Sequence, residues 1–507
     1  MLARAISYTT LGLDAVRVFI EVDAVLGLPA LTIVGLPDQA VRESRERVRS
    51  AVLNSQFHLP SQRFTINLAP ADIKKEGGSF DLAIALGLLA ASHQLDPAAV
   101  ESVIALGELA LDGAVRPVRG VLPIALGARR TRRPLLVPAA NAPEAALVDG
   151  LRVVPVRTLT DAAAHLSGAS PIPSYVPPPP DGREGDAGDA DFADVKGQPH
   201  ARRALEVASA GGHHVLLIGP PGSGKTLLAQ RLPGILPPWT PDEALETSAI
   251  HSVAGALDGE PLLARRPFRA PHHTSSAIAL IGGGPVPRPG EVSLAHAGVL
   301  FLDELPEFPR HVLETLRQPL EEGRVRLARV RRSVTFPSRF MLIAAMNPCP
   351  CGYLTDARGR CRCPSTQIQR YLARVSGPLL DRIDLHVDVP ALPPEVLQRI
   401  EPGESSEEIR RRVAAARARQ RARLAPLGLA CNAELRPRHL RKVCALTAEA
   451  ERLLHAAVSE LGLSARAYDK ILRLGRTIAD LAASEGVHAA HIAEAVQYRS
   501  LDRTLWV

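Results

Sequence analysis

The sequence contains no long apolar run. Although 46% of its 507 residues are hydrophobic, no uncharged apolar stretch approaches the roughly 18 to 20 residues that a membrane-spanning helix requires. The first residues, MLARAISYTTLGLDAV, have scattered apolar positions and no small-residue cleavage site, so they do not match a signal peptide. We therefore expect a soluble cytoplasmic protein of about two to four domains, with no membrane partner.

Lysine is scarce. Only six of the 60 basic residues are lysines, and the arginines are spread over the whole chain. The formal net charge of +7 is compatible with an anionic partner such as nucleic acid. An arginine bias this even is interpreted first as genome composition, so the charge alone is weak evidence for such a partner. Lys225 stands out because so few lysines surround it in the sequence.

Cysteine is also rare, but its distribution is uneven. Four of the six cysteines fall within fifteen residues, in the pattern Cys349-x-Cys351-x₉-Cys361-x-Cys363. Two close thiol pairs in one loop of a cytoplasmic protein favour a tetrahedral Zn²⁺ site over disulfides. The CxC spacing differs from the usual CxxC and strains chelation by one metal, so unliganded thiols are the alternative. Cys431 and Cys444 are interpreted as ordinary buried or surface thiols.

A strand, a glycine-rich loop and a helix follow one another near residue 220. The apolar run 215–218 leads into the loop, and residues 227–230 have the pattern of a helix. The loop matches GxxxxGK[ST] and consists of Gly219, Pro220, Pro221, Gly222, Ser223, Gly224, Lys225 and Thr226. Glycine lets backbone N–H groups wrap a phosphate without side-chain interference. We therefore predict ATP binding, with Lys225 at the β- and γ-phosphates and Thr226 on Mg²⁺; a glycine-rich turn without chemistry is the alternative.

Polar residues end two further apolar strands. The run 299–302 ends in Asp303 and Glu304, at the carboxyl edge of the same predicted sheet. Asp303 is predicted to hold the Mg²⁺ shell, and Glu304 to orient and activate the attacking water. Asn347 follows the strand 340–345 and can hydrogen-bond the attacking water or the γ-phosphate. A plain strand-ending Asn-Pro turn is the alternative for Asn347.

Composition divides the chain into four parts. Residues 1–170 alternate strand and helix patterns, as expected of one α/β domain. Residues 171–190 are rich in proline and then in glycine and acidic residues, which predicts a linker that is stiff first and flexible after. Residues 191–395 contain the nucleotide motifs, and residues 396–507 have helical patterns, starting with a capping box at 405–408 and a run rich in arginine.

In the first and third parts, the patterns predict specific elements. For 1–170 they predict strands at 16–22, 63–68 and 135–138 and helices at 38–52, 81–91 and 161–166. For 191–395 they predict strands near 215–218, 245–250, 299–302, 340–345 and 385–389. Strands that alternate with helices indicate a parallel sheet with helices on both faces.

Several segments resemble the ComM (YifB) family within the magnesium-chelatase-like AAA+ ATPases, nearly from end to end of the chain. The segments are PFRAPHH at 267–273, PGE at 289–291, LAH at 294–296, the acidic pair at 303–304, MNPCPCG at 346–352 and SGPLLDRID at 376–384. The resemblance implies a Lon-protease-like (ribosomal S5 domain 2-like) N-terminal domain, an AAA+ P-loop parallel-sheet core and a C-terminal helical lid. It also implies a homo-hexameric DNA motor, a helicase or branch-migration factor acting on single-stranded or branched DNA in natural transformation and recombination.

The resemblance assigns three further roles. The position of Asn347 is called sensor 1 in this family. Arg382 matches the arginine finger that points into the ATP of the neighbouring subunit and supplies positive charge to the transition state. A structural salt bridge to Asp381 or Asp384 is the alternative for Arg382. Arg466, at the start of a C-terminal helix, resembles the sensor 2 arginine that also contacts phosphate, and both arginines imply a ring.

Two segments are candidates for DNA contact. Residues 323–336 alternate arginine with apolar side chains, which predicts a two-stranded ribbon with one cationic face. Its arginines can contact phosphates without reading sequence, namely Arg324, Arg326, Arg329, Arg331 and Arg332. The long insertion 254–290 is the second segment, and in related ring helicases hairpins at both places grip DNA in the pore. An exposed ribbon kept polar for solubility is the alternative for 323–336, and His272 and His273 are expected to hydrogen-bond within the insertion.

The N-terminal part raises a different function. Residues 75–81, KEGGSFD, resemble the segment of Lon-type protease domains that carries the nucleophilic serine, with Ser79 in its place. Such a serine needs a lysine base, but the aligned position is Leu122 and no lysine lies between Lys75 and Lys196. We therefore expect no peptidase activity, and interpret the domain as a ring-building or DNA-contacting collar. A chelatase-type motor acting on a protein partner remains the main alternative function, and an ATP-dependent protease is a third.

Overall fold

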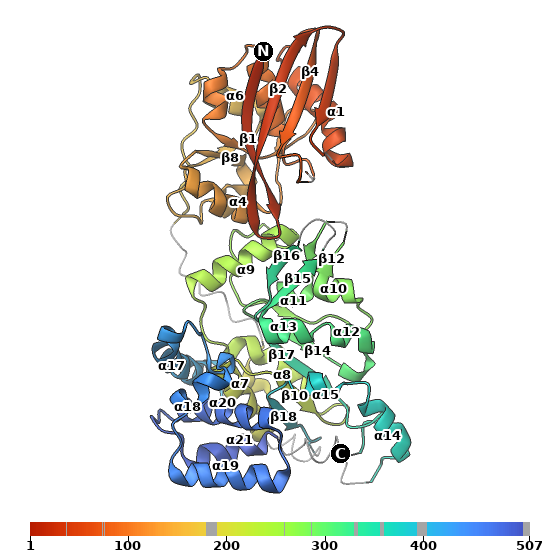
Figure 1. Ribbon diagram of the computed structural model, residues 1–507, viewed down its shortest axis with the longest axis vertical. Coiled ribbons are helices and arrows are strands. Elements are labelled where there is room, and N and C mark those ends of the chain that lie inside the picture. Colours follow the sequence, from red (N-terminus) through yellow and green to blue (C-terminus); the bar gives the residue numbers. More distant parts are fainter. Residues whose placement is uncertain are drawn as a thin grey trace.

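A computed structural model describes residues 1–36, 38–73, 75, 77–178, 190–257, 259–284, 286–328, 333–354, 359–392 and 403–499. An α/β N-terminal part lies at one end of the longest axis, a central part built on a parallel sheet follows it, and a helical C-terminal part lies beside the half of the central part that is farther from the N-terminal part (Figure 1). The predicted α/β class, with a parallel sheet and a helical C-terminus, is thereby confirmed. Within the residues described, no helix is both long and apolar enough to cross a membrane.

The N-terminal part contains a mixed four-stranded sheet in the order β1-β2-β4-β3 and a parallel three-stranded sheet in the order β5-β8-β9. Its strands are β1 Leu2–Leu11, β2 Asp14–Leu26, β3 Ala30–Val34, β4 Gln62–Ala69, β5 Ile104–Ala105, β6 Glu108–Leu109, β7 Val115–Arg116, β8 Leu135–Pro138 and β9 Val153–Val156. Its helices are α1 Gln39–Asn54, α2 Asp81–Ala91, α3 Pro97–Glu101, α4 Val121–Ala128, α5 Ala142–Ala145 and α6 Leu159–Leu166. The strand predicted at 16–22 is confirmed as part of β2, in which the alternate residues Val18, Ile20 and Val22 are all buried on the core face.

The central part is built on a five-stranded parallel sheet in the order β11-β14-β17-β10-β18. Its strands are β10 Val215–Ile218, β11 Phe268–Arg269, β14 Val299–Leu302, β17 Met341–Met346 and β18 Leu385–Asp388. The register pairs Ile218 with Met346 and Leu302 with Ala344, so β10, β14 and β17 end at the same edge. The phosphate loop, the acidic pair and Asn347 therefore emerge side by side.

Helices and two hairpins surround this sheet. The helices are α7 Pro199–Gly211, α8 Lys225–Arg231, α9 Pro241–Ala254, α10 Ala277–Ile281, α11 Glu291–Leu294, α12 Arg310–Glu314, α13 Arg317–Glu322, α14 Ser365–Leu372 and α15 Gly377–Leu380. The hairpins are β12 Gly282–Gly283 with β13 Arg288–Pro289, and β15 Arg324–Ala328 with β16 Ser333–Pro337. The C-terminal helices are α17 Ser406–Leu424, α18 Pro437–Val443, α19 Ala448–Leu461, α20 Ala465–Leu481 and α21 Ala489–Gln497.

Alternate residues of the central strands enter two different cores. Val215 and Leu217 pack with the C-terminal helices, whereas Leu216 and Ile218 pack with α12, α15 and the helices around them. Both faces of a parallel sheet are covered in this way, which explains why its strands have continuous apolar runs. The C-terminal helices are thus fixed to the central parallel sheet by one shared core.

The predicted strand at 245–250 is wrong, because these residues lie inside helix α9. Thr240 caps the helix by accepting a hydrogen bond from the N–H of Glu243, whose carboxylate in turn accepts one from the N–H of Thr240. Pro241 occupies the first turn and Gly255 ends the helix with a left-handed φ of 72°. The capping box, Pro241 in the first turn and Gly255 at the end together favour a helix over the strand predicted for these residues. The fifth strand of the sheet is instead β11.

Helix α9 also joins the N-terminal part to the central part. Leu122 of α4 is fully buried in a core that includes Ala249 of α9. The N–H of Gly120 donates to the carbonyl oxygen of Ser252, and the Ser252 hydroxyl donates to the buried carboxylate of Glu144. Burial raises the pKa of Glu144, which these hydrogen bonds partly offset. The N-terminal part is therefore docked on helix α9 of the central part by apolar and polar contacts together.

The segment predicted as a linker, 171–190, lies mostly outside the described residues. Its first residues are held by the N-terminal part, because the N–H of Tyr175 donates to the carbonyl oxygen of Val153 at 2.8 Å and the N–H of Ile172 to Nδ1 of His165 at 2.9 Å. The proline-rich stretch thus begins as an extension of that part.

His214, at the start of β10, makes stability pH-dependent. Its Nδ1 accepts a hydrogen bond from the N–H of Leu342 at 3.0 Å, which requires a neutral ring. Desolvation lowers the pKa of His214 to about 4. The charge of Asp384 acts to raise this pKa, whereas Lys470 and His213 lower it further. Between pH 6.5 and pH 4 the imidazole of His214 is therefore protonated in the unfolded chain but mostly neutral in the folded one. We expect the free energy of unfolding to be about 2 kcal/mol lower at pH 5 than at pH 7 from this group.

The measurement is unfolding of wild type and of His214→Gln at both pH values. The substitution should flatten the difference between pH 5 and pH 7, whereas the control His311→Gln, at an exposed position, should retain it. Equal pH dependence in all three proteins would contradict the assignment to His214.

Candidate ATP-binding site

The phosphate loop has the backbone that its sequence pattern predicts. Gly222 and Gly224 have φ values of 75° and 90°, in the left-handed region that favours glycine, and α8 begins at Lys225. The Lys225 ammonium is buried and donates to the carbonyl oxygens of Gly219 at 2.8 Å and Pro220 at 2.9 Å. Burial lowers its pKa, while the charge of Asp303 acts in the opposite direction. The loop therefore holds a cation at the place where phosphates would lie.

The predicted magnesium ligands meet beside this loop. The Thr226 hydroxyl donates to Oδ2 of Asp303 at 2.7 Å, across the gap between α8 and the end of β14. The other carboxylate oxygen, Oδ1, accepts the N–H of Glu304 at 2.9 Å. A hydroxyl and a carboxylate at one sheet edge are the oxygen ligands that Mg²⁺ prefers beside a phosphate. The residues present thus fit a magnesium ion bound together with a nucleotide.

Asn347 completes this cluster. Its Oδ1 lies 3.2 Å from the Nζ of Lys225, so the strand end after β17 contacts the phosphate loop directly. The register of β14 and β17 places the strand before Asn347 directly beside the strand before Asp303. Asn347 is therefore placed where an amide can reach a terminal phosphate or its attacking water.

His273 also belongs to the site, and contrary to the prediction that it hydrogen-bonds within the insertion, it contacts Glu304. Its Nδ1 lies 3.2 Å from Oε2 of Glu304, and its ring meets Phe308 edge-on. Glu304 itself has a left-handed φ of 51°, which turns its side chain away from the strand direction. His272 behaves as expected, since its Nδ1 contacts the Thr274 hydroxyl at 2.9 Å within the insertion. Only the position of His273, four residues after β11, could have indicated its contact with the acidic pair.

We expect His273→Ala to lower the rate of ATP hydrolysis by about ten- to hundredfold, because Glu304 loses the group that positions it. His273→Asn, which retains a hydrogen-bond donor, should recover part of the rate. The measurement is kcat and KM as a function of pH, and the matched control is His272→Ala. If both alanine variants behave alike, the contact with Glu304 has no role in hydrolysis.

Arg382 lies at the opposite edge of the sheet from the phosphate loop. Arg382 precedes β18, whose first residue pairs with Val215 at the start of the parallel strand β10. The phosphate loop begins after Ile218, at the other end of β10, so the two ends are about 13 Å apart along the strand direction. The guanidinium of Arg382 donates to Oε2 of Glu321 at 2.5 Å and to the carbonyl oxygen of Pro378 at 2.6 Å. The alternative partners expected from the sequence, Asp381 and Asp384, are thus replaced by a residue of α13.

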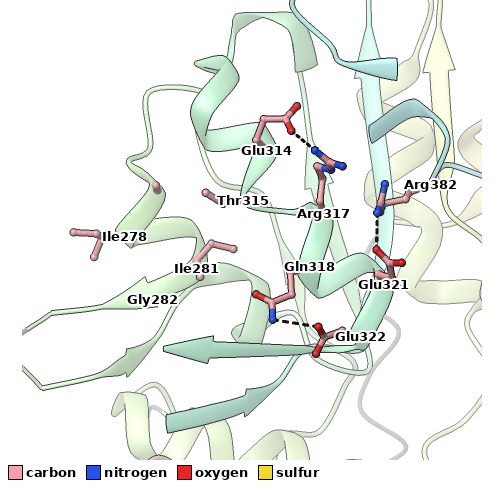
Figure 2. Close-up of a pocket in the computed structure, with 11 residues that line it drawn as sticks. Ile278, Ile281, Gly282, Glu314, Thr315, Arg317, Gln318, Glu321, Glu322 and Arg382 are labelled. Atoms are coloured by element: carbon pink, nitrogen blue, oxygen red, sulfur yellow. Dashed lines mark hydrogen bonds and ion pairs between the residues drawn. The ribbon is translucent and has the colours of Figure 1, made fainter. Parts of the chain in front are cut away.

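A groove of about 670 Å³ opens beside this ion pair (Figure 2). Two ion pairs flank it, Arg382 with Glu321 and Arg317 with Glu314, and Ile278 lies across from them. The pairs are partly exposed, so solvent screens them and another anion can compete for the arginines.

Arg466 lies near the same edge. It opens α20, and its Nη1 lies 3.2 Å from Oδ2 of Asp381, with 70% of the side chain exposed. Asp381 precedes β18, so this arginine too is remote from the phosphate loop of its own chain. Neither arginine therefore completes the ATP site within one chain.

The arginine ribbon exists, but only part of it can be placed. Arg324 and Arg326 point outward from β15 and lie 3.4 and 3.1 Å from the carboxylate of Glu322. The other predicted DNA ligands lie outside the described residues, namely Arg329, Arg331 and Arg332. Val334 of β16 packs so close to Gly12, in the β1–β2 turn, that a side chain there would collide with it. The ribbon thus lies under the N-terminal part, as Figure 1 shows.

The structure places three residues that bear on the predicted protease-like site, Lys75, Ser79 and Leu122. Lys75 is buried, and its ammonium donates to the carbonyl oxygens of Gly35, at 3.0 Å, and of Pro70. Burial lowers its pKa, with Asp72 acting in the opposite direction. Leu122, where the resemblance requires a lysine, is sealed in the contact with α9. Ser79 remains only half-buried, at the start of the turn into α2.

The parallel sheet, the phosphate loop and the acidic pair after β14 define a P-loop protein of the AAA+ type. Three family profiles match the chain: "Magnesium chelatase, subunit ChlI" over residues 191–397, "Subunit ChlI of Mg-chelatase" over 20–141, and "Magnesium chelatase, subunit ChlI C-terminal" over 403–499. The chain belongs to the ComM/YifB family of magnesium-chelatase-like AAA+ proteins, which confirms the resemblance drawn from its motifs.

Similar proteins cover the chain to different extents. Competence protein ComM of Haemophilus influenzae is 45% identical over 507 residues, 99% of this chain and 98% of that protein. YifB of Salmonella typhimurium is 46% identical over 496 residues, 98% of this chain and 96% of that protein. The magnesium-chelatase 67 kDa subunit of Chlorobaculum parvum is 29% identical over 162 residues, which are 31% of this chain and 23% of that protein.

Proposed function

We propose that the chain hydrolyses ATP as a subunit of a homo-hexameric ring, in which each site is completed by its neighbour. The observation that carries this is the separation of the parts: Lys225 and Asn347 contact each other at one edge of the sheet, whereas Arg382 and Arg466 lie at the other. A ring brings the second edge of one subunit against the first edge of the next. The partners Glu321 and Asp381 hold the two arginines until a neighbour's phosphates replace them.

Within one subunit the residues divide the work. Lys225 holds the β- and γ-phosphates, Glu304 orients and activates the attacking water, and Asn347 hydrogen-bonds that water or the γ-phosphate. Thr226 and Asp303 hold Mg²⁺, which when bound supplies Lewis-acid stabilisation of the phosphate oxygens. The position of each side chain at the carboxyl edge of the sheet supports the role proposed for it.

The ring acts on DNA, as a helicase or branch-migration motor that drives natural transformation and recombination in the cytoplasm. The name of the Haemophilus influenzae relative, a competence protein, supports this role. The ribbon β15–β16 and the hairpin β12–β13 supply contacts to the phosphate backbone, with Arg324 and Arg326 exposed on the first. The N-terminal part, Lon-like in fold and without peptidase activity, forms a collar above the ribbon and contributes to ring building.

The alternative is a motor of the chelatase type that remodels a protein partner. It is supported by the family descriptions and by the match to a magnesium-chelatase subunit over about a third of the chain. That motor would need neither exposed arginines on the ribbon nor stimulation by nucleic acid. The response of ATP hydrolysis to DNA therefore separates the two functions.

The test is ATP hydrolysis with and without single-stranded and forked DNA, at about 50 and about 200 mM salt, since backbone contacts weaken steeply with salt. We expect DNA to stimulate hydrolysis at low salt, and Glu304→Gln to abolish hydrolysis with or without DNA. The double variant Arg324→Ala/Arg326→Ala should lose most of the stimulation but keep the basal rate, whereas the surface control Arg370→Ala should behave as wild type. Hydrolysis indifferent to every DNA form at low salt would favour the chelatase-type motor.

A further inference from the structure

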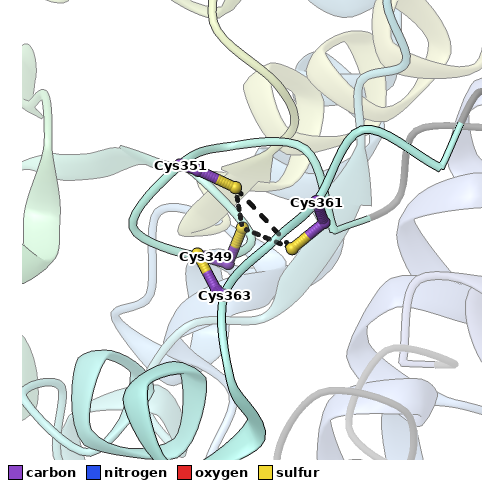
Figure 3. Close-up of side chains that lie close together, drawn as sticks. All are labelled: Cys349, Cys351, Cys361 and Cys363. Carbon is purple, nitrogen blue, oxygen red and sulfur yellow. Dashed lines mark hydrogen bonds between the residues drawn. The ribbon is translucent and has the colours of Figure 1, made fainter.

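Four cysteines come together in the loop after Asn347. The Sγ atom of Cys349 lies 3.4 Å from that of Cys351 and 3.7 Å from that of Cys361, and the latter two are 3.6 Å apart (Figure 3). With Cys363, all four sulfurs lie within 4.8 Å of one another. A tetrahedron with Zn–S bonds of about 2.3 Å has edges of about 3.8 Å, so these separations are those of four ligands around one ion. A disulfide would require a separation of about 2 Å.

The backbone explains how the unusual CxC spacing works. The N–H of Gly352 donates to the carbonyl oxygen of Cys349 at 2.9 Å, closing a tight turn that brings the first two thiols together. Cys361 and Cys363 lie in the segment just before α14, which forms neither helix nor strand. One pair is therefore supplied by a turn and the other by the segment before α14, and because all four sulfurs lie within 4.8 Å of one another, neither pair needs to chelate the metal alone.

The same loop contacts the ATP site. Gly352 has a φ of 82°, and a Cβ placed there would lie 2.4 Å from Cδ of Pro221, in the phosphate loop, and 3.7 Å from Cγ of Asn347. Asn347 precedes Cys349 by two residues and contacts Lys225. The cysteine turn is thus packed against both the phosphate loop and the amide that faces it.

We propose that Cys349, Cys351, Cys361 and Cys363 bind one Zn²⁺ and that this metal positions Asn347 and Pro221 for ATP. Four thiolates are soft ligands that select zinc, and a closed set of four leaves no open position, so the metal is structural. Sulfurs this close enclose a single ion and leave no room for an iron–sulfur cluster. Because Gly352 follows Cys351 directly, loss of the ion frees the turn that abuts the phosphate loop.

The first experiment measures the metal. Wild type should contain about one zinc per chain, and Cys361→Ser/Cys363→Ser should contain almost none. The matched control, Cys431→Ala/Cys444→Ala, removes two thiols buried among the C-terminal helices and should retain the zinc. Co²⁺ added to metal-free protein should give thiolate charge-transfer absorption in wild type and control only. Iron in place of zinc, near-zero metal in wild type, or equal metal in all three proteins would overturn the site.

The second experiment measures the coupling, without DNA, so that it does not depend on the proposed action on DNA. We expect Cys361→Ser/Cys363→Ser, and wild type stripped by a chelator, to lose about a hundredfold in kcat/KM for ATP hydrolysis and to bind a fluorescent ATP analogue more weakly. Zinc added back should restore the stripped wild type but not the variant. Retention of zinc-independent ATP binding and hydrolysis would overturn the positioning role even if the metal is present.

Discussion

Arg382→Ala should bind ATP as tightly as wild type and hydrolyse it about a thousandfold more slowly. The reason is its place at the sheet edge opposite its own phosphate loop, from which, in the proposed ring, it would serve the ATP of a neighbour. The matched control is Glu321→Ala, which removes the partner of the guanidinium but keeps the arginine. If the ion pair itself mattered, both variants would lose activity, whereas a finger that acts between subunits leaves Glu321→Ala active.

Mixing variants tests the same assignment without reference to folding. Lys225→Ala subunits lack a working phosphate loop but keep Arg382, and Arg382→Ala subunits have the reverse defect. In a one-to-one mixture about a quarter of the interfaces combine an intact loop with an intact arginine, so about a quarter of the wild-type rate should return. No recovery in mixed rings, although both variants assemble, would contradict the arrangement. Arg466→Ala can replace Arg382→Ala in the same experiment, as a test of the second arginine.

The site residues contributed by the phosphate loop and the acidic pair could be predicted because each lies in a short contiguous pattern. Lys225 and Thr226 are defined by the loop, and Asp303 by the apolar strand before it. Parallel strands end at one edge, so three local patterns were enough to predict a common site. The contact of His273 with Glu304 could not be predicted, because it depends on how a long insertion folds back onto the sheet edge, which no local pattern encodes.

The strand predicted at 245–250 was wrong, although the signals for the helix that forms there are local in the sequence. The six residues of that window do not by themselves distinguish a strand from a helix, and the decisive signals lay outside it, at the cap residue Thr240 and at Gly255. The partners of Arg382 and Arg466 could not be predicted either, because Glu321 and Asp381 are distant in sequence from the residues they pair with. Long-range polar pairing is set by tertiary structure, which the sequence pattern alone does not contain.

The arginine-rich run 409–424 shows how misleading composition can be. A basic run can indicate nucleic-acid binding, but in α17 two of its arginines hold the helix to the central part. Arg417 donates to the carbonyl oxygen of Ser209 at 2.9 Å, and Arg412 contacts the carboxylate of Glu206 at 2.5 Å. Both partners belong to α7, which packs beside β18 of the parallel sheet. These side chains are engaged in structure, which leaves the ribbon β15–β16 as the better candidate for DNA.

The largest expected effect on stability comes from a buried ion pair in the C-terminal part, between Asp480 and Arg476 of α20. Asp480 is 1% exposed and accepts hydrogen bonds from Arg476, which is 2% exposed, at 2.9 Å and from Arg423 at 2.6 Å. Asp480→Ala leaves the buried guanidinium of Arg476 without its counter-charge, so we expect it to cost about 3 to 5 kcal/mol. Asp480→Asn, which keeps an acceptor but not the charge, should cost less.

Hydrogen exchange of the α20 amides is the measurement, because it reports local opening of the C-terminal helices even when the whole chain does not unfold in one step. The control is Glu407→Ala, which breaks the exposed pair with Arg411 on α17 and should cost less than about 1 kcal/mol. If Asp480→Ala and Glu407→Ala open α20 equally, the buried network is not what holds these helices. If only Asp480→Ala does so, ATP hydrolysis should fall with it, because the C-terminal helices and the ATPase sheet share one core.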